Sequence, residues 1–186
     1  MYLYHVKKRV ERESDFEIDK LTNSIENTVT SEVFDTGVTP IYSKDKRQIK
    51  NADWVFDWHK EFKNPKNEIF KLTTINNPTI IQGLICIIDK DDHIFMSLIE
   101  SAKFNKGKSK LYKGVAGNLV AFSCKVSFEK GYEGVVSFIA KSRLIDHYHQ
   151  TLGAKQFGES NRMFIDTKEG LALVKQYFKN VNNGKF

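Results

Sequence analysis

The sequence contains few residues of the kinds that build disulfide frameworks or membrane spans. Two of its 186 residues are cysteine and three are proline. Cys86 and Cys124 each lie inside an apolar run and not in the paired spacing of a metal site, so we expect buried thiols in a reducing compartment. No run reaches the roughly 18 apolar residues of a membrane helix, and the first residues lack a cleavable apolar segment. The sequence thus predicts a cytoplasmic protein without a membrane partner.

Charged residues, in contrast, are abundant and biased towards the positive sign. Lysine and arginine number 29 against 23 acidic residues, which gives a net charge of +6. This balance favours an anionic ligand or partner, although a solvated basic surface explains the same numbers. The length and a hydrophobic content of 40% suit a single globular domain over residues 1–186.

The N-terminal part predicts a strand, a helix and a loop. Residues 1–10 are predicted as a strand, and Ser14 with Glu17 has the spacing of a capping box that opens a helix. That helix would bury one face, made by Ile18, Leu21, Ile25 and Val29. Glycine, proline and a polar cluster then favour a loop over residues 30–51, either disordered or acting as a mobile lid.

Residues 54–101 are rich in strand-forming side chains separated by turn residues. Four consecutive, mostly antiparallel strands are expected, at 54–58, 68–75, 79–89 and 93–101. The turn from Asp89 to Asp92 is short enough for a hairpin that puts Ile87 and Ile94 in neighbouring strands.

The last third of the chain alternates helices with strands. We expect a helix at 115–130, a strand at 133–141, a helix at 142–153, a hairpin of 154–158 with 161–166, and a helix at 166–178. Gly131 and Gly153 would end the first two helices, while Ser142 and Asp166 would cap the later two. The fold class is therefore α/β (α+β), with a central mixed, mostly antiparallel sheet flanked by helices.

The stretch LYKGVAGN, residues 111–118, places small residues at the start of a helix. Free N–H groups at a helix N-terminus attract phosphate, and Gly114, Ala116 and Gly117 leave room for a pyrophosphate to approach the backbone. Tight packing of the helix on a strand is the alternative reason for small residues here. The stretch does not have the GxxxxGK[ST] pattern, and the connection from the preceding strand is too long for a dinucleotide-binding turn.

Over residues 68–166 the sequence resembles the GNAT family of acyl-CoA N-acyltransferases. LYKGVA stands where the family has Q/R-x-x-G-x-G/A, and Leu119 is the usual following leucine. Leu111 replaces the leading Gln or Arg, a loss of polarity that Lys110 or Lys113 could compensate.

A second stretch carries the same resemblance. In the predicted helix at 142–153, Tyr148 precedes Gly153 as in the family. Ala154 stands where the family has an aromatic residue, and Lys141 or Ser142 stands where it often has asparagine.

The resemblance implies an N-acetyltransferase with acetyl-CoA as its co-substrate. Its pantetheine arm would lie along the strand at 93–101, with the amide of Ile99 near the thioester oxygen. The implied cofactor-binding residues are Leu98, Ile99, Leu111, Tyr112, Lys113, Gly114, Val115, Ala116, Gly117, Asn118, Lys141 and Ser142. Within the single domain, residues 1–60 would form the acceptor site and residues 61–186 the acyl-CoA-binding core.

Acetyl transfer to an amine also needs a proton for the leaving thiolate. The resemblance implies Tyr148 as this general acid, with a packed tyrosine as the alternative. Glu100, at the end of its strand, is the candidate general base; the alternative is an exposed glutamate, with water as the base. No metal is predicted, because His147 and His149 are two apart on a helix and point in different directions.

Two further groups of side chains stand near these motifs. The lysines at 103, 106, 108, 110 and 113 could pair with the ribose phosphate of coenzyme A, or form a solvated loop or a nucleic-acid-facing ridge. Trp54, Phe56 and Trp58 alternate along the predicted first strand and are expected in the core, with an outer edge that could line the acceptor pocket.

The predicted function is transfer of an acetyl group from acetyl-CoA to a primary amine of an unknown acceptor, which is a small molecule, a protein or an aminoacyl-tRNA. A homodimer is compatible with this prediction. Two alternatives remain: an inactive acyl-CoA-binding module, favoured by the departures at Leu111 and Ala154, and a basic, nucleic-acid-associated acetyltransferase directed at tRNA.

Overall fold

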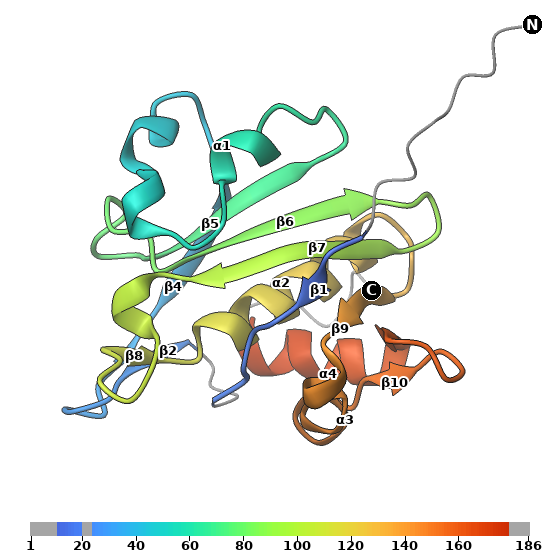
Figure 1. Ribbon diagram of the computed structural model, residues 1–186. Helices are drawn as coiled ribbons and strands as arrows, with labels where there is room; N and C mark the ends of the chain where they lie inside the picture. The colour runs from blue at the N-terminus through green and yellow to red at the C-terminus, as the bar shows by residue number, and fades with distance from the viewer. Residues whose placement is uncertain (1–10, 20–23, 179–186) are drawn as a thin grey trace, which may run out of the picture.

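The computed structural model describes residues 11–19 and 24–178 (Figure 1). The strand predicted at 1–10 lies outside these residues. A central sheet separates two layers: α2 and α4 cover one face, and α1 with its flanking loops covers the other (Figure 1). This layering confirms the predicted fold class.

The central sheet has the strand order β10-β11-β9-β7-β6-β5-β4. Its members are β4 (Thr36–Pro40), β5 (Glu68–Thr74), β6 (Gly83–Asp89), β7 (Ile94–Ser101), β9 (Val136–Ala140), β10 (Lys155–Gln156) and β11 (Arg162–Ile165). Neighbours on this path run antiparallel except β7 and β9, which run parallel. The predicted β6–β7 hairpin is confirmed, with Asp89 opposite Ile94.

The parallel pair β7 and β9 stays together over only two residues. Ile94 lies opposite Val136 and Phe95 opposite Ser137, after which the strands part. Beyond that point β9 pairs in parallel with the two-residue strand β1 (Glu13–Ser14). Among the described residues, no strand pairs with residues 96–101 of β7 on the side facing β9. β7 therefore has an open edge where β9 diverges.

The described residues form the α-helices α1 (Trp58–Glu61), α2 (Val115–Glu129), α3 (Ile145–Leu152) and α4 (Thr167–Tyr177). Short 3-10 helices occur at Asp45–Gln48, Asn51–Asp53, Lys103–Asn105 and Ser142–Leu144. Asp166 caps α4 by accepting from the N–H groups of Lys168 and Glu169, and Gly153 ends α3 with a φ of 63°, both as predicted. Within residues 11–19 and 24–178, no helix is long and apolar enough to cross a bilayer.

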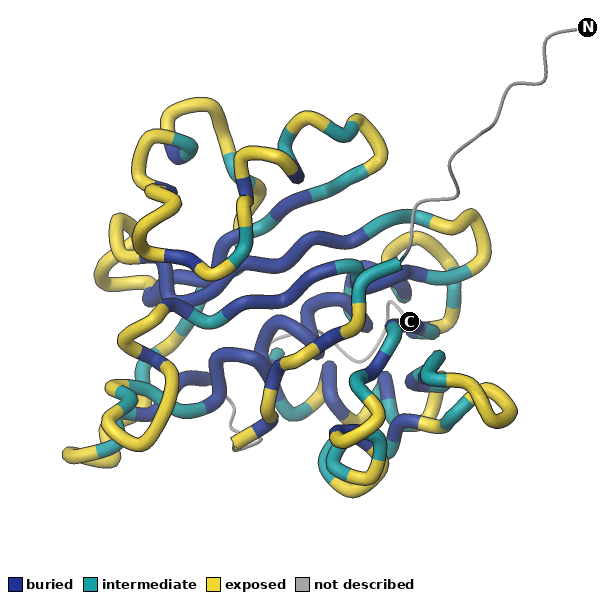
Figure 2. Tube along the Cα trace, in the orientation of Figure 1, coloured by how far each residue is buried: buried dark blue, intermediate teal, exposed yellow. Residues whose placement is uncertain are grey.

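The core lies on both sides of the sheet, and α2 is buried almost all round (Figure 2). The predicted inner face of α2 is confirmed, because Val115, Leu119, Phe122 and Val126 are all buried. Cys124 belongs to this larger cluster, while Cys86 belongs to the smaller one beneath α1. Neither cysteine forms a disulfide, both are buried as expected, and burial raises the pKa of Cys124 to about 12.

The helix predicted from Ser14 is wrong over the residues that the structure describes. Residues 13–19 are extended, with β1 at their start, and their side chains alternate between exposed and buried. β2 (Ile25–Asn27) pairs with β3 (Val33–Phe34) and β8 (Tyr112–Lys113) in a small second sheet. Val29, expected on a buried helical face, is 87% exposed. Leu21 of the same predicted face lies outside the described residues.

Three further local predictions are wrong. Residues 30–51 are not a plain loop, because they contain β3 and β4; Pro40 is tolerated at the end of β4 because that strand forms the edge of the sheet. Residues 54–57 are a loop and not a strand, and Trp58 begins α1, whose first turn Asp57 caps by accepting from Lys60 N–H. Ser142 does not cap α3, since its hydroxyl donates to Asn161 and α3 begins three residues later.

The close packing of α2 on β6 generates a first prediction. An added Cβ at Gly83 would lie 2.7 Å from Val115 Cγ1 and 3.2 Å from the carbonyl oxygen of Glu100. Gly83→Ala should therefore lower the free energy of unfolding by about 1–3 kcal/mol, because a β-branched side chain and a strand backbone cannot move aside. Urea denaturation measures this. Gly37→Ala is the control, since nothing lies within 4 Å of its Cβ position; equal losses would contradict the packing explanation.

Candidate active site

A cavity of about 310 Å³ lies beside the open edge of β7. Ile99 and Glu100 of β7 line one side, and Val115 and Ala116 at the start of α2 line another. Phe56 from the opposite face of the sheet also reaches the cavity. Two of the predicted cofactor-binding groups, the β7 edge and the start of α2, are therefore brought together.

The loop before α2 is only partly free to bind a ligand. The N–H of Leu111 donates to the carbonyl of Phe104 at 2.8 Å, and the N–H of Tyr112 donates to Asn105 Oδ1 at 3.2 Å. These bonds disfavour a ligand role for the two amides. The N–H groups of Val115, Ala116 and Gly117 have no acceptor among the described residues, as expected for the first turn of a helix. Anion binding by this loop would therefore centre on residues 115–117.

Gly114 is the N-cap of α2 and has a φ of 89°, which favours glycine. Its N–H donates to Asp19 Oδ1 at 3.0 Å. The other oxygen of the same carboxylate accepts from Lys110 Nζ at 2.7 Å. A carboxylate of this protein thus lies on the helix N-terminus that was expected to hold phosphate.

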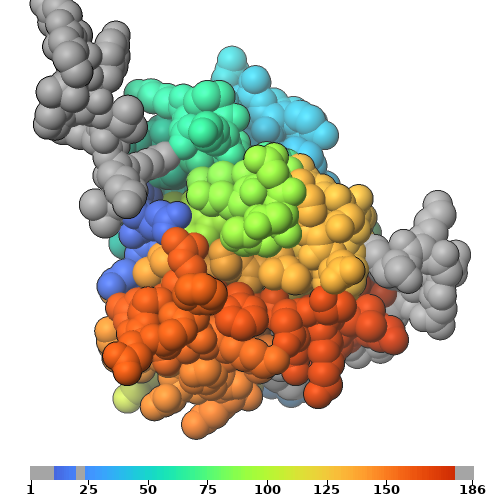
Figure 3. Space-filling model, turned by 90° about the vertical axis from the view of Figure 1, so that its right-hand side faces the viewer, coloured from blue at the N-terminus to red at the C-terminus, as the bar shows by residue number. Residues whose placement is uncertain are grey.

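Asp19 is the last described residue of an extended segment, residues 13–19, which we call the strap. The strap lies between β7 and β9 in Figure 1, and its blue atoms reach the surface between the green strands and the orange C-terminal part in Figure 3. Phe16 and Ile18 point inward and are 6% and 5% exposed. The space that opens between the parting strands is therefore filled in part by the chain itself.

Tyr148 of α3 is fully buried beside the strap. Its hydroxyl donates to the carbonyl oxygen of Phe16 at 2.7 Å, and its ring lies 4.9 Å from the ring of Phe16 and 5.2 Å from that of Phe138. Burial raises the pKa of Tyr148, so the hydroxyl stays protonated at neutral pH. Tyr148 does not itself line the cavity, and its hydroxyl proton is directed at the backbone of the strap, so its role as the general acid stays a prediction.

Charged and polar contacts hold the strap on the side of β9 and α3. Asp15 pairs with Lys141 and Arg143; burial opposes its ionisation, but these two cations outweigh burial and lower the pKa of Asp15. The N–H of Ile18 donates to His147 Nε2 at 2.9 Å. Lys141, predicted to bind the cofactor, is thus engaged with the strap.

The two histidines of α3 lie in different surroundings. His147 accepts a bond from the strap, whereas His149 is exposed. In the part of the chain that the structure describes, no three or more histidine, cysteine or acidic side chains are grouped as a metal site would require.

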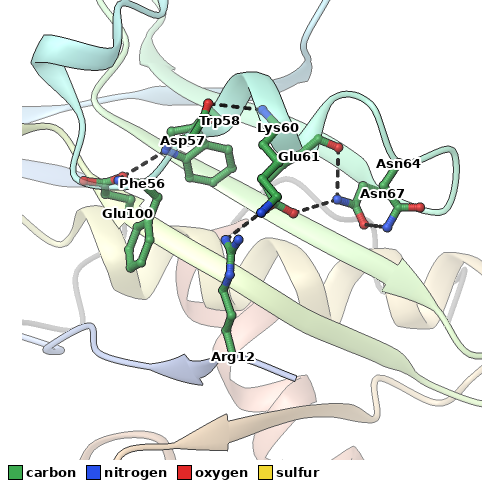
Figure 4. Close-up of polar contacts among 9 residues, drawn as sticks. All are labelled: Arg12, Phe56, Asp57, Trp58, Lys60, Glu61, Asn64, Asn67 and Glu100. Carbon is green, nitrogen blue, oxygen red and sulfur yellow. Dashed lines mark hydrogen bonds and ion pairs between the residues drawn. The ribbon is translucent and has the colours of Figure 1, made fainter. Parts of the chain in front are cut away.

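Glu100 is buried, and Figure 4 shows it beside Phe56 and Trp58, two of the residues that donate to its carboxylate. Its carboxylate accepts from Val55 N–H at 2.7 Å, Phe56 N–H at 3.3 Å, Trp58 Nε1 at 2.9 Å and Lys106 Nζ at 2.8 Å. The alternative of an exposed strand-end glutamate is wrong, since Glu100 is 2% exposed. The four donors favour a structural role, fixing the loop before α1, over the predicted role of general base.

A second buried carboxylate, Glu61 of α1, escaped the sequence analysis. It pairs with Arg12 at 2.9 Å and accepts from Asn67 Nδ2 at 2.9 Å (Figure 4). Arg12 immediately precedes the strap. This ion pair therefore ties the start of the strap to α1 on the other side of the sheet.

The predicted lysine run does not form one patch. Lys103 bonds the carbonyl of Ala52, Lys106 pairs with Glu100 and Lys110 pairs with Asp19. Lys106 and Lys110 line the cavity.

The aromatic residues predicted on one strand have different surroundings. Trp54 and Trp58 pack in the core as predicted, with their rings in T-shaped contact at a centroid distance of 6.3 Å, whereas Phe56 lines the cavity.

The strap is the feature of the site that sequence reasoning missed, although a signal for it exists. In SDFEID, residues 14–19, apolar Phe16 and Ile18 alternate with acidic residues, which is the two-residue period of an extended segment. The helical spacing of Ile18, Leu21 and Ile25 obscured this alternation.

Neither a known protein family nor a curated protein matches the chain. Solved structures do match. A mutant AtaT toxin bound to the C-terminus of the antitoxin AtaR and acetyl-CoA is 13% identical, with a TM-score of 0.51; the match covers 76% of this chain and 99% of that chain. The KacTA–DNA complex is 13% identical with a TM-score of 0.55, and the match covers 74% of this chain and 97% of that chain. Spermidine N-acetyltransferase from Vibrio cholerae in complex with CoA and spermine is 15% identical with a TM-score of 0.51, and the match covers 73% of this chain and 98% of that chain. At this identity the likeness shows the fold, and it confirms the predicted GNAT-like fold.

The contacts of Glu100 generate a second prediction. Glu100→Gln should lower the free energy of unfolding by about 1–3 kcal/mol, because an amide cannot accept from all four donors and leaves buried N–H groups unpaired. Both tryptophans of the chain lie at this corner, so their fluorescence reports the change directly. Glu68→Gln, which removes an exposed pair with Lys130, is the control. An unchanged stability with lost turnover would instead support the role of base.

Proposed function

We propose that the protein transfers an acetyl group from acetyl-CoA to a primary amine. One observation carries the proposal: the open edge of β7 and the free N–H groups at the start of α2 line the same cavity. A free strand edge binds an extended, amide-containing chain, and a helix N-terminus binds phosphate. Pantetheine and the diphosphate of coenzyme A have these two chemistries in this order.

The residues around the cavity also fit the chemistry of acetyl transfer. The backbone of Leu98 and Ile99 would align the pantetheine, with the Ile99 N–H stabilising the oxyanion that forms when the amine attacks the thioester carbonyl. As the carbon–sulfur bond breaks, Tyr148 would donate its proton to the leaving thiolate. The attacking amine would lose its proton to water, because Glu100 is already occupied by four donors.

The structural neighbours support the same class of reaction. One of them binds acetyl-CoA, and another, a spermidine N-acetyltransferase, binds CoA and spermine. For the present chain we infer an amine acceptor that enters past Val55 and Phe56, which line the cavity. This entry would make residues 1–60 the acceptor side of a single domain. Small amines, protein amines and aminoacyl-tRNA are the three acceptor classes to compare.

A third prediction concerns binding of the co-substrate. Acetyl-CoA should bind the purified protein in calorimetry, whereas Gly114→Glu should abolish binding, because a carboxylate side chain would lie where the diphosphate approaches. Gly37→Glu adds the same side chain on β4, with nothing within 4 Å of its Cβ position, and should leave affinity unchanged. Near-UV circular dichroism checks that both variants fold. Binding of acetyl-CoA by a folded Gly114→Glu variant would contradict the placement.

A fourth prediction concerns the proton donor. Tyr148→Phe should lower kcat by about 100-fold at saturating acetyl-CoA, because the thiolate would leave without a positioned proton donor. Transfer is followed as thiol release with spermidine, a peptide with a free N-terminus and an aminoacyl-tRNA as acceptors. The control is Tyr132→Phe, whose hydroxyl bonds Asp89 away from the cavity. Unchanged kcat in Tyr148→Phe would remove this residue as the acid, and binding without transfer to any acceptor would favour the inactive module.

A further inference from the structure

The strap lies along the path that the proposed co-substrate would take. It pairs with β9 where β7 and β9 diverge, with Glu13 opposite Ile139 and Ser14 opposite Ala140. The carbonyl oxygen of Phe16 in the strap accepts a hydrogen bond from the hydroxyl of Tyr148. It ends with Asp19 on the N–H of Gly114. Along its length the strap thus contacts β9 where it diverges from β7, then Tyr148, and then the N-terminus of α2.

We propose that the strap is an internal competitor of coenzyme A, which must leave its place before the co-substrate binds. This inference rests on the proposed function, because it takes the cavity and the start of α2 as the coenzyme site. It adds a regulatory element: the chain holds its own site closed until the coenzyme displaces residues 13–19.

Asp19 is the part of the strap that most directly imitates the ligand. An anion there bonds a backbone N–H at the N-terminus of a fifteen-residue helix and an ammonium group, at 3.0 and 2.7 Å. A coenzyme phosphate would use the same two donors. One donor pair cannot serve both anions, so the carboxylate and the phosphate exclude each other.

The contacts of the strap allow it to be released without unfolding the domain. It pairs with β9 over two residues, and residues 13, 15, 17 and 19 are exposed. The Asp19–Lys110 pair is partly open to solvent, with side chains 21% and 24% exposed, and such pairs contribute little to stability. The buried residues of the strap are Ser14, Phe16 and Ile18, of which the last two are apolar. Segments held by few buried contacts open at a fraction of the cost of global unfolding.

Closure by the strap lowers the affinity for the coenzyme by a definite factor. When only a fraction of the molecules is open, the measured dissociation constant is the intrinsic constant divided by that fraction. Weakening the strap therefore tightens binding without any new contact to the ligand. A substitution that removes a hydrogen bond at the site and yet raises the affinity for acetyl-CoA is therefore a specific sign of competition by the strap.

Hydrogen–deuterium exchange of the full chain tests the displacement. With saturating acetyl-CoA, amides of residues 114–118 should exchange more slowly, and amides of residues 13–19 should exchange faster, since Ile18 N–H loses its bond to His147. Opposite signs in the two segments support the proposal. Slower or unchanged exchange over 13–19 with protection at 114–118 overturns it while leaving the proposed function intact.

Calorimetry of two alanine variants gives an independent test. Asp19→Ala should bind acetyl-CoA about tenfold more tightly than the wild type, which corresponds to about 1.4 kcal/mol. Glu17→Ala removes the same charge two residues away, from a side chain without a hydrogen bond to Gly114 or Lys110, and should bind like the wild type. Equal affinities, or the same gain in both variants, overturn the proposal. If Asp19→Ala binds acetyl-CoA and the wild type does not, the proposal is supported in its strongest form. If neither the wild type nor the two variants bind acetyl-CoA, the proposed function is overturned as well.

Discussion

The site depends on one feature of the sheet, the short parallel pairing of β7 and β9. Because the two strands hold register at only two positions, the backbone groups of β7 beyond Phe95 are left without a strand partner on that side among the described residues. The start of α2 packs against β6 at Gly83, close to the same edge, and so brings a helix N-terminus to the opening. Without the parting of these strands there would be neither a cavity nor room for residues 13–19.

Electrostatics inside the cavity differ from those of the whole chain. The net charge is +6, yet the cations that line the cavity are paired with carboxylates of the chain itself: Lys106 with Glu100, Lys110 with Asp19 and Arg143 with Asp15. An anionic ligand therefore meets no excess of positive charge here and must compete for donors that are already used. The basic composition alone says little about this site.

The sequence was most informative where the signal is local. The apolar face of α2, the terminating Gly153 and the cap at Asp166 each depend on a few neighbouring residues, and all three were predictable. The resemblance implies a common site for Tyr148 and Ile99, which stays a prediction. The strap was not predictable by the same route, because its extended conformation is set by contacts more than 90 residues away, with Gly114 and Tyr148. The surroundings of Glu100 were not predictable for a related reason: three of its four donors come from residues 54–58, which were expected to be a strand, and the fourth is Lys106.

The ion pair between Arg12 and Glu61 gives the competitor an unusual property. The strap is covalently part of the chain and this pair fastens the chain just before it, so a released strap would stay beside the opening and return as an intramolecular event. Its local concentration is then set by the length of the tether and is independent of how much protein is present. Dilution would weaken a separate inhibitor but leaves this one unchanged, so the coenzyme level needed to open the site is a fixed property of each molecule.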